Sequence, residues 1–362
     1  MITRGELIVM HRILCLLFVL FVVRSASAQG LPSSEFSGDW VPLGPAPVDQ
    51  AGSGRRGYVM AGEDSDVTPA GANRFSIHAV AANNFYREQN SDFLVTQRYE
   101  THTIALGYRR GFKVSGFPRF EIGGQVQLHE RGSGVLNGFI LGIERFWASV
   151  TGYAASENEL RSGHATAPPL GTVIARNGSA IYRQDGGGSG LGDVSTIAKV
   201  ALLEGDPSSR APRVAARMGI NVAGSSPFTE GNFFGAGLSL DQKLSARVAF
   251  HGDVRATRAL DRMSAWNLPL KGWAYGFTLG PEFKLPNDSS LNLQLDGSST
   301  PYRPTGTLAF DKGYGAITFG LGHRFSRQVG AQLYVRENMN LPFTVRWNTD
   351  PDLAVGVKIR VY

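Results

Sequence analysis

The sequence predicts an all-β protein built as one antiparallel transmembrane β-barrel of about twelve strands, within a range of roughly ten to fourteen. Three observations predict this fold. Strand-length segments alternate between apolar and polar residues, and the N-terminus carries an export signal. After the apolar run of that signal, no further apolar run is long enough to form a membrane helix. The chain has 362 residues, of which 45 are glycine and 18% are charged, and this suits one such barrel with its loops.

The clearest alternation lies between Arg213 and Arg255 and predicts three neighbouring strands. In the first strand, every second residue from Val214 to Val222 is apolar, and the residues between them are small or polar. Successive side chains point to opposite faces of a strand, so one face is apolar and the other is polar. A soluble sheet turns its polar face to water. A membrane barrel turns that face to the lumen and the apolar face to lipid.

The candidate functional residues lie on the polar faces of these strands. They are Arg213, Arg217, Asn221, Arg247, His251, Asp253 and Arg255. One interpretation is a basic constriction that favours anions or tunes the passage of solutes. The other is a ladder of salt bridges and hydrogen bonds that stiffens the wall, since every polar interior needs such pairing. The pattern leaves both interpretations open.

The N-terminus has the features of a secretory signal peptide over residues 1–28. Arg4 and Arg12 precede an apolar run over residues 13–23, and small residues at 26–28 provide a cleavage site. The single cysteine, Cys15, lies inside the apolar run. The predicted mature chain therefore enters an oxidising compartment without any disulfide.

After the signal, residues 29–72 are rich in Pro, Gly, Ser and Asp and predict an irregular N-terminal segment, with the barrel following over residues 73–362. The remaining strands are expected at residues 73–83, 97–109, 119–130, 171–183, 194–202, 272–285, 291–297, 315–325, 331–335 and 353–361. Longer links alternate with short turns, as in barrels whose outer loops are long. Both termini are then expected on the periplasmic side.

Two segments depart from the strand pattern. Apolar residues recur every three or four positions over residues 135–147, which predicts a short amphipathic helix in a loop. It could lie in the membrane interface, plug the barrel, pack on its mouth, or begin another strand. The glycine-dense residues 184–193 lack the Lys-Ser/Thr of a phosphate loop and predict a flexible turn before the next strand.

The sequence shows no catalytic, cofactor or metal motif. His102, His129, His251 and His323 fall in predicted strands without metal-ligand spacing, and no Gly-x-Ser-x-Gly elbow is present. A serine–histidine pair on the barrel wall, as in outer-membrane lipid hydrolases, is conceivable. Because no such motif is present, we predict no enzymatic activity, no cofactor and no bound metal.

Residues 133–140 (SGVLNGFI), 190–194 (GLGDV) and 293–302 (LQLDGSSTPY) resemble a domain-of-unknown-function family of Gram-negative outer-membrane β-barrels. The resemblance extends from about residue 57 to residue 362. It implies a barrel fold and an outer-membrane location, and it brings no catalytic residues. The C-terminal Tyr362 resembles the aromatic assembly signal of such barrels, although the apolar residues before it have the opposite parity.

These features predict a passive, porin-like channel for small solutes in the outer membrane of a Gram-negative bacterium. The alternatives are a closed structural or envelope-interaction barrel and an outer-membrane lipid hydrolase. The expected partners are outer-membrane lipid and lipopolysaccharide, the barrel-assembly machinery and a small solute. The net charge of +6 is spread along the chain without a dense basic run, which argues against nucleic acid as a partner.

Overall fold

The computed structural model describes residues 40–47, 60–132, 171–205, 210–224, 231–338 and 353–361. Within these residues the regular structure is almost entirely β, apart from the one-turn helix α4 (Leu308–Asp311). The strands are β1 (Asn73–Gln89), β2 (Phe93–Phe112), β3 (Phe120–Gly132), β4 (Gly171–Arg176), β5 (Ser179–Asp185), β6 (Gly188–Leu203), β7 (Arg213–Val222), β8 (Phe233–Lys243), β9 (Val248–Ala259), β10 (Trp273–Lys284), β11 (Ser289–Ser298), β12 (Tyr314–Arg324), β13 (Val329–Asn338) and β14 (Leu353–Val361). Among the helices so described, none has the length and apolar character needed to cross a membrane.

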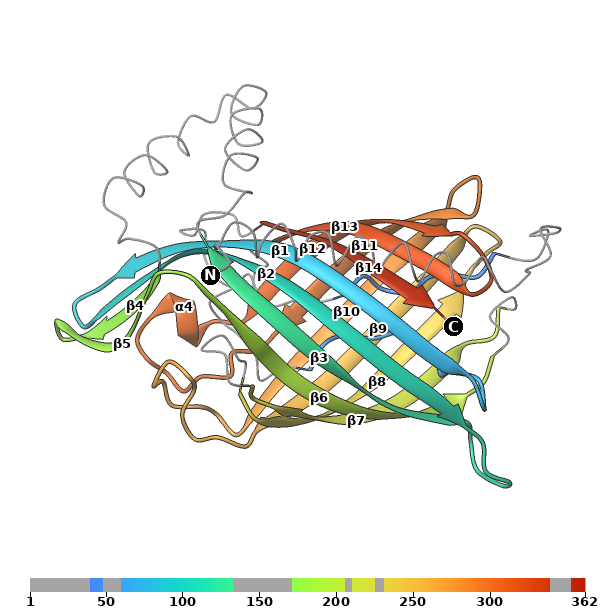
Figure 1. Cartoon of the computed structure of the whole chain (residues 1–362), viewed down its shortest axis with the longest axis horizontal. Coiled ribbons are helices and arrows are strands. Elements are labelled where there is room, and N and C mark those ends of the chain that lie inside the picture. Colours follow the sequence, from blue (N-terminus) through green and yellow to red (C-terminus); the bar gives the residue numbers. More distant parts are fainter. Residues whose placement is uncertain are drawn as a thin grey trace, which may run out of the picture.

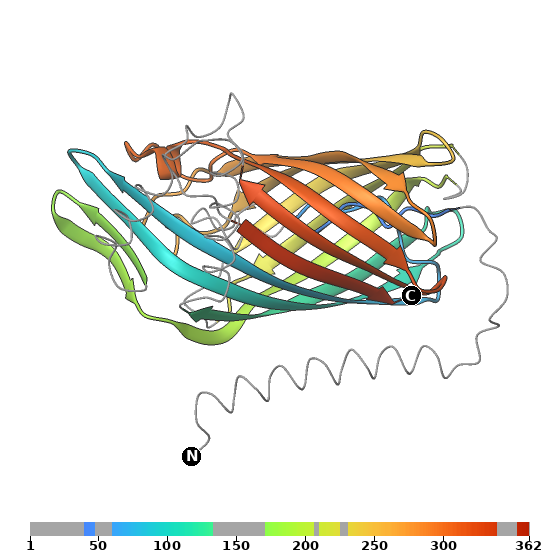
Figure 2. The same cartoon turned by 90° about the horizontal axis from the view of Figure 1, so that it is seen from above.

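Twelve strands form a closed antiparallel barrel (Figures 1 and 2). The ring runs from β1 through β2 and β3 to β6, and then continues in chain order to β14. It closes because β1 pairs with β2 on one side and with β14 on the other, from Phe75 opposite Val361 to Ala82 opposite Ala354. The predicted antiparallel barrel of about twelve strands is confirmed.

A hairpin outside the ring accounts for the other two strands. β4 pairs with the start of β2, from Phe93 to Arg98, and β5 pairs only with β4. Both strands lie beside the extended ends of β1 and β2, beyond the rest of the barrel (Figures 1 and 2). One strand was predicted here. The Asn177-Gly178 pair has positive φ at both residues, which divides the segment into a tight hairpin.

The glycine-dense segment is mostly strand, so its prediction as a flexible turn is wrong. β6 begins at Gly188, and residues 188–191 pair with β3. Just before it, a side chain on Gly187 would meet the carbonyl oxygen of Arg131 at 2.3 Å. Glycine permits this close approach of two backbones, which composition alone does not distinguish from a flexible turn. The predicted helix at residues 135–147 lies outside the described residues.

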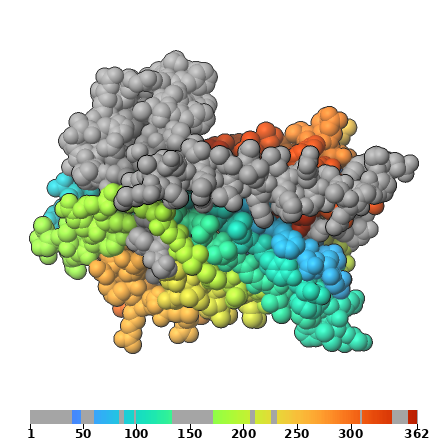
Figure 3. Space-filling view, in the orientation of Figure 1, coloured from blue at the N-terminus to red at the C-terminus, as the bar shows by residue number. Residues whose placement is uncertain are grey.

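The barrel buries polar side chains and exposes apolar ones. Buried polar residues on the strands include Thr101, Glu121, Lys199, Arg217, Ser239, Asp253, Thr278, Asn292, Thr318 and Gln332. Exposed apolar residues include Phe75, Ile122, Met218, Leu238, Val254, Tyr275, Phe319 and Leu333. Figure 3 shows part of the outer surface, over β2, β3 and β6. Water-soluble proteins have the opposite arrangement, so this wall is suited to a lipid environment.

The two ends of the barrel differ. Connections 244–247, 285–288 and 325–328 are short and lie at the end where β1 begins and β14 finishes. At the other end, connections 260–272 and 299–313 are longer and form an apolar core with β2 and β4, in which Trp266, Tyr302 and Phe310 are buried. The first end is called the short-turn end below.

Candidate functional site

The barrel lumen contains two parts of the segment that precedes β1, residues 40–47 and residues 60–72. Both are irregular and run between the walls of the barrel (Figures 1 and 2). Their backbones bond to lumen-facing side chains of many strands. The irregular structure agrees with the prediction for this region, but its position inside the lumen was not predicted.

Residues 40–47 are attached to the strands of the second half of the chain. The backbone amides of Leu43 and Gly44 each donate to a carboxylate oxygen of Glu282 on β10, both at 3.0 Å. The carbonyl oxygen of Gly44 accepts from the amide of Gln332 on β13 at 2.7 Å. The carbonyl oxygen of Leu43 accepts from Arg360 on β14 at 3.1 Å. These bonds satisfy backbone groups that irregular structure leaves unpaired.

Residues 60–72 are held in the same way by other strands. The backbone amide and hydroxyl of Ser65 both donate to Asp241 on β8, at 2.7 and 2.6 Å. The amide and hydroxyl of Thr68 donate to Glu121 on β3, at 2.7 and 2.6 Å. A carboxylate that accepts two hydrogen bonds fixes the backbone at that point. The segment is therefore tied to the wall at several levels.

Glu63 and Asp64 place two negative charges among four cations of the wall. Glu63 contacts Arg109 on β2 and lies 3.4 Å from Lys199 on β6, and it also faces Arg217 on β7 at 3.7 Å. Asp64 lies 3.2 Å from Lys199 and 2.5 Å from Arg360. This arrangement is called the charge cluster below.

The charge cluster sets the ionisation of the segment. Burial raises the pKa of Glu63, but the charges of Arg109, Lys199 and Arg217 outweigh it, so its pKa lies well below the ordinary range. Burial likewise raises the pKa of Asp64, and Arg360, Lys199 and other wall cations bring it well below the ordinary range. Both carboxylates are therefore ionised at neutral pH.

Most of the predicted lumen residues lie on the inner face. Arg217 donates to both oxygens of Asp253 at 2.9 and 2.8 Å, and Arg255 donates to the same carboxylate at 2.9 Å. His251 lies between Asp241 at 2.6 Å and Glu282 at 2.9 Å. These are the two carboxylates that hold residues 65 and 43–44, so His251 links two anchoring points of the segment.

The other three predicted residues differ in their surroundings. Arg213 is half-buried and forms long ion pairs with Asp66 and Asp241. Asn221 is buried and donates to the carbonyl oxygen of Gly231 at 2.8 Å. The prediction for Arg247 is wrong, because it lies exposed in the turn between β8 and β9. Residues 244–247 happen to alternate in the same way as the strand that follows them. The predicted strand therefore began too early, because β9 starts only at Val248.

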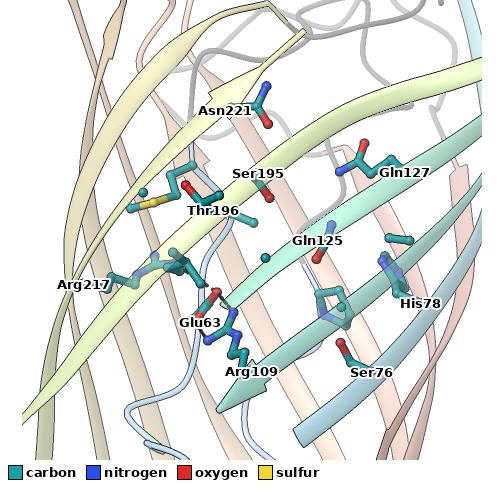
Figure 4. Close-up of a pocket in the computed structure, with 18 of the residues that line it drawn as sticks. Glu63, Ser76, His78, Arg109, Gln125, Gln127, Ser195, Thr196, Arg217 and Asn221 are labelled. Carbon is teal, nitrogen blue, oxygen red and sulfur yellow. Dashed lines mark hydrogen bonds and ion pairs between the residues drawn. The ribbon is translucent and has the colours of Figure 1, made fainter. Parts of the chain in front are cut away.

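A cavity of about 180 Å³ remains between the segment and the wall. It follows the inner face of β14, β1, β2, β3, β6 and β7. In Figure 4, Asn221 lies toward one end of the cavity, and Glu63 and Arg109 lie toward the other. The cavity exists because small residues, including Ser76, Gly107 and Ser195, occupy lumen positions of one cross-strand row there.

Several residues of the site were not singled out from the sequence. They are Glu63, Asp64, Arg109, Lys199, Glu282 and Arg360. The alternation of residues 353–361 does place Lys358 and Arg360 on one face, which is a signal for lumen cations. Glu63 and Asp64 lie in a segment without periodicity, and nothing in its pattern indicates that it enters the barrel.

Ser289 and His323 do not form a complete hydrolytic site in the part of the chain that the structure describes. His323 accepts or donates a hydrogen bond with Ser289 at 3.0 Å, and both have the outward parity of Leu291 and Leu321. Its other ring contact is with Phe325. Within the described residues, no carboxylate or amide bonds to the ring, so the third member that would orient it is missing there.

Comparisons with known proteins find similarity in structure and none in sequence. No family model matches the chain, and no curated protein sequence matches it. The solved structure of an outer-membrane channel from Pseudomonas putida F1 is 11% identical and has a TM-score of 0.54, covering 82% of this chain and 97% of that chain. The NanC porin is 9% identical with a TM-score of 0.40, covering 80% of this chain and 99% of that chain. The CymD monoaromatic hydrocarbon channel is 8% identical with a TM-score of 0.39, covering 81% and 89%.

The likeness to the Pseudomonas putida channel shows a shared barrel fold. The resemblance to an uncharacterised outer-membrane family, which the sequence suggested, stays a prediction.

Proposed function

We propose that this protein is a passive, non-enzymatic channel for small solutes in the bacterial outer membrane, with its N-terminal segment resident in the lumen. The observation that carries the proposal is the inverted wall, with apolar side chains outward and a polar cavity inside. The fold likeness to a solved outer-membrane channel supports it. The short-turn end would face the periplasm, as in other outer-membrane barrels.

The segment limits the size of the path in this proposal. Backbone bonds and the charge cluster fix it in the lumen, and the remaining cavity of about 180 Å³ lies on one side of it. Solutes would pass along the cavity side, where side chains are small. The same occupation of the lumen favours the second candidate function, a closed structural barrel, so an experiment must separate the two.

The test is single-channel recording of the purified, folded protein and of the double variant Glu63→Gln with Asp64→Asn. The variant keeps the shape of both side chains and removes the charges that pair with four wall cations. Hydrogen bonds to charged groups contribute roughly 1.5–3 kcal/mol each, so the time spent in a higher-conductance level should increase about tenfold or more.

The matched control is Asp92→Asn with Asp185→Asn, which neutralises two exposed carboxylates outside the lumen. It should leave the conductance unchanged. A wild-type protein without conductance, together with a double variant that is equally silent, would establish the closed barrel and rule out the channel.

A further inference from the structure

The cavity has an inner surface that the register of the strands explains. One cross-strand row runs from Arg360 through Ser76, Gly107 and Gln125 to Ser195, each opposite the next on the neighbouring strand. The adjacent row contains Lys358, His78, Ala105 and Gln127. All nine residues line the cavity. The two rows thus form one continuous wall of small, amide and hydroxyl side chains and the imidazole of His78, with cations at the β14 side.

Positive charges outnumber negative charges on this surface. The lining includes the cations Arg74, Arg109, Arg217, Lys358 and Arg360, against the acids Glu63 and Asp64. Four of the five cations belong to ion pairs with those acids or with acids of the wall, such as Arg74 with Glu121 at 2.7 Å. Among the residues that the structure describes, Lys358 forms no ion pair and no hydrogen bond.

Some neutral hydrogen-bonding groups on other strands of the same cavity also make no hydrogen bond among the described residues. The carboxamides of Gln125 and Gln127 and the hydroxyls of Ser76 and Ser195 make no hydrogen bond within the described ranges. These four side chains are partly exposed to the cavity rather than buried, so their polar groups are available to a ligand or to water inside it. Figure 4 shows Gln125, Gln127 and Ser195 gathered around the cavity.

We infer that this cavity is a binding site for a small polar carboxylate, with Lys358 as the residue that binds its charge. One cation without an ion pair matches one negative charge, and an ammonium attracts a carboxylate without the fixed geometry that arginine requires. Amide and hydroxyl groups further along the same wall suit the polar remainder of the molecule. The inference rests on the proposed function in that a lumen site would select what the channel passes.

Binding is tested directly, by isothermal titration calorimetry of the full-length, detergent-folded protein with sodium gluconate, and with glucose as the uncharged probe. Wild type should bind gluconate and not glucose. Lys358→Met should weaken gluconate binding roughly tenfold or more, because a charge-assisted hydrogen bond is lost. Lys358→Arg retains the charge and should retain most of the affinity.

The matched control is Lys312→Met, which removes an exposed lysine in the connection between β11 and β12. It should bind gluconate as wild type does. Equal affinity of Lys358→Met and wild type, an equal loss in Lys312→Met, or no binding to wild type would each overturn the site. A protein that binds gluconate through Lys358 but never conducts would keep the site and remove the channel function.

Discussion

Charge pairs hold many of the single residues in the lumen. Asp253 accepts from Arg217, Arg255 and Ser239, and all of these groups are buried. Removing one partner of a buried pair leaves the other charge without compensation, which costs far more than the pair itself contributes. The ladder interpretation of the polar parity therefore describes Arg217, Asp253 and Arg255 better than an open basic constriction does.

Arg217→Met tests this at a single position. The substitution keeps an unbranched side chain without the guanidinium and leaves Asp253 with one fewer cation, so the free energy of unfolding should fall by about 3 kcal/mol. The temperature at which the folded band is lost on semi-native gels measures the change. Arg247→Met, at the exposed turn position, should stay within about 0.5 kcal/mol of wild type. Equal effects of the two substitutions would contradict the ladder.

The strands themselves were largely predictable, and the reason is their period of two. Where one face meets lipid and the other meets the lumen, residue type follows parity, as along β7 and β9. The signal disappears where that contrast ends. The extensions of β1 and β2, the separate β4–β5 hairpin and the glycine-rich start of β6 lie outside any clean alternation. At Arg247 alternation continued by chance into a turn.

Leu238→Lys tests whether the apolar face of β8 lies against lipid. Leu238 is 48% exposed on β8, and in water a lysine there would be harmless. In a bilayer, a lysine on the lipid face costs roughly 2–4 kcal/mol near the midplane. We expect a reduced folded fraction in lipid vesicles, measured by the mobility shift on unheated gels. Ser245→Lys, in the β8–β9 turn, should fold as wild type does, and equal folding of both variants would indicate a water-facing wall.

The whole molecule is a barrel and a segment that depend on each other's charges. Without the segment, the wall would hold lumen cations that lack the negative charges of Glu63 and Asp64. Without the wall, the backbone amides of the segment would lack the carboxylates that accept their hydrogen bonds. This mutual arrangement could not be read from the sequence, because ion pairs between residues more than a hundred positions apart leave no local pattern. Composition predicted an irregular segment. Its place inside the lumen follows from ion pairs and hydrogen bonds with distant strands, which composition does not reveal.

The depressed pKa values of Glu63 and Asp64 fix the pH dependence of this arrangement. A carboxylate whose pKa is lowered by folding stabilises the docked segment above its ordinary pKa, which is 4.5 for Glu63 and 3.8 for Asp64. That contribution is lost as the pH falls through the lowered values. Docking should therefore be constant between about pH 5 and 8 and weaken progressively as the pH falls below about 4.5, where the undocked carboxylates begin to take up protons.

Thiol labelling of Val67→Cys in a chain without Cys15 measures this docking. Val67 is 1% exposed beside Ala201 and Ala215, so its thiol should react only when the segment leaves the wall. Glu63→Gln with Asp64→Asn in the same background should label faster at neutral pH. A labelling rate that increases already between pH 6 and 5 would show that other groups control docking.

The contacts of Arg360 have a consequence for the order of assembly. Arg360 lies on β14, next to the seam where the last strand meets the first, and it bonds to Leu43, which is 317 positions away in the chain. It also pairs with Asp64. The chain must therefore bring its beginning and its end together inside a nearly complete sheet. Contacts of such sequence separation form late and slowly, so closing the seam over residues 40–47 is expected to be the final and rate-limiting event of biogenesis.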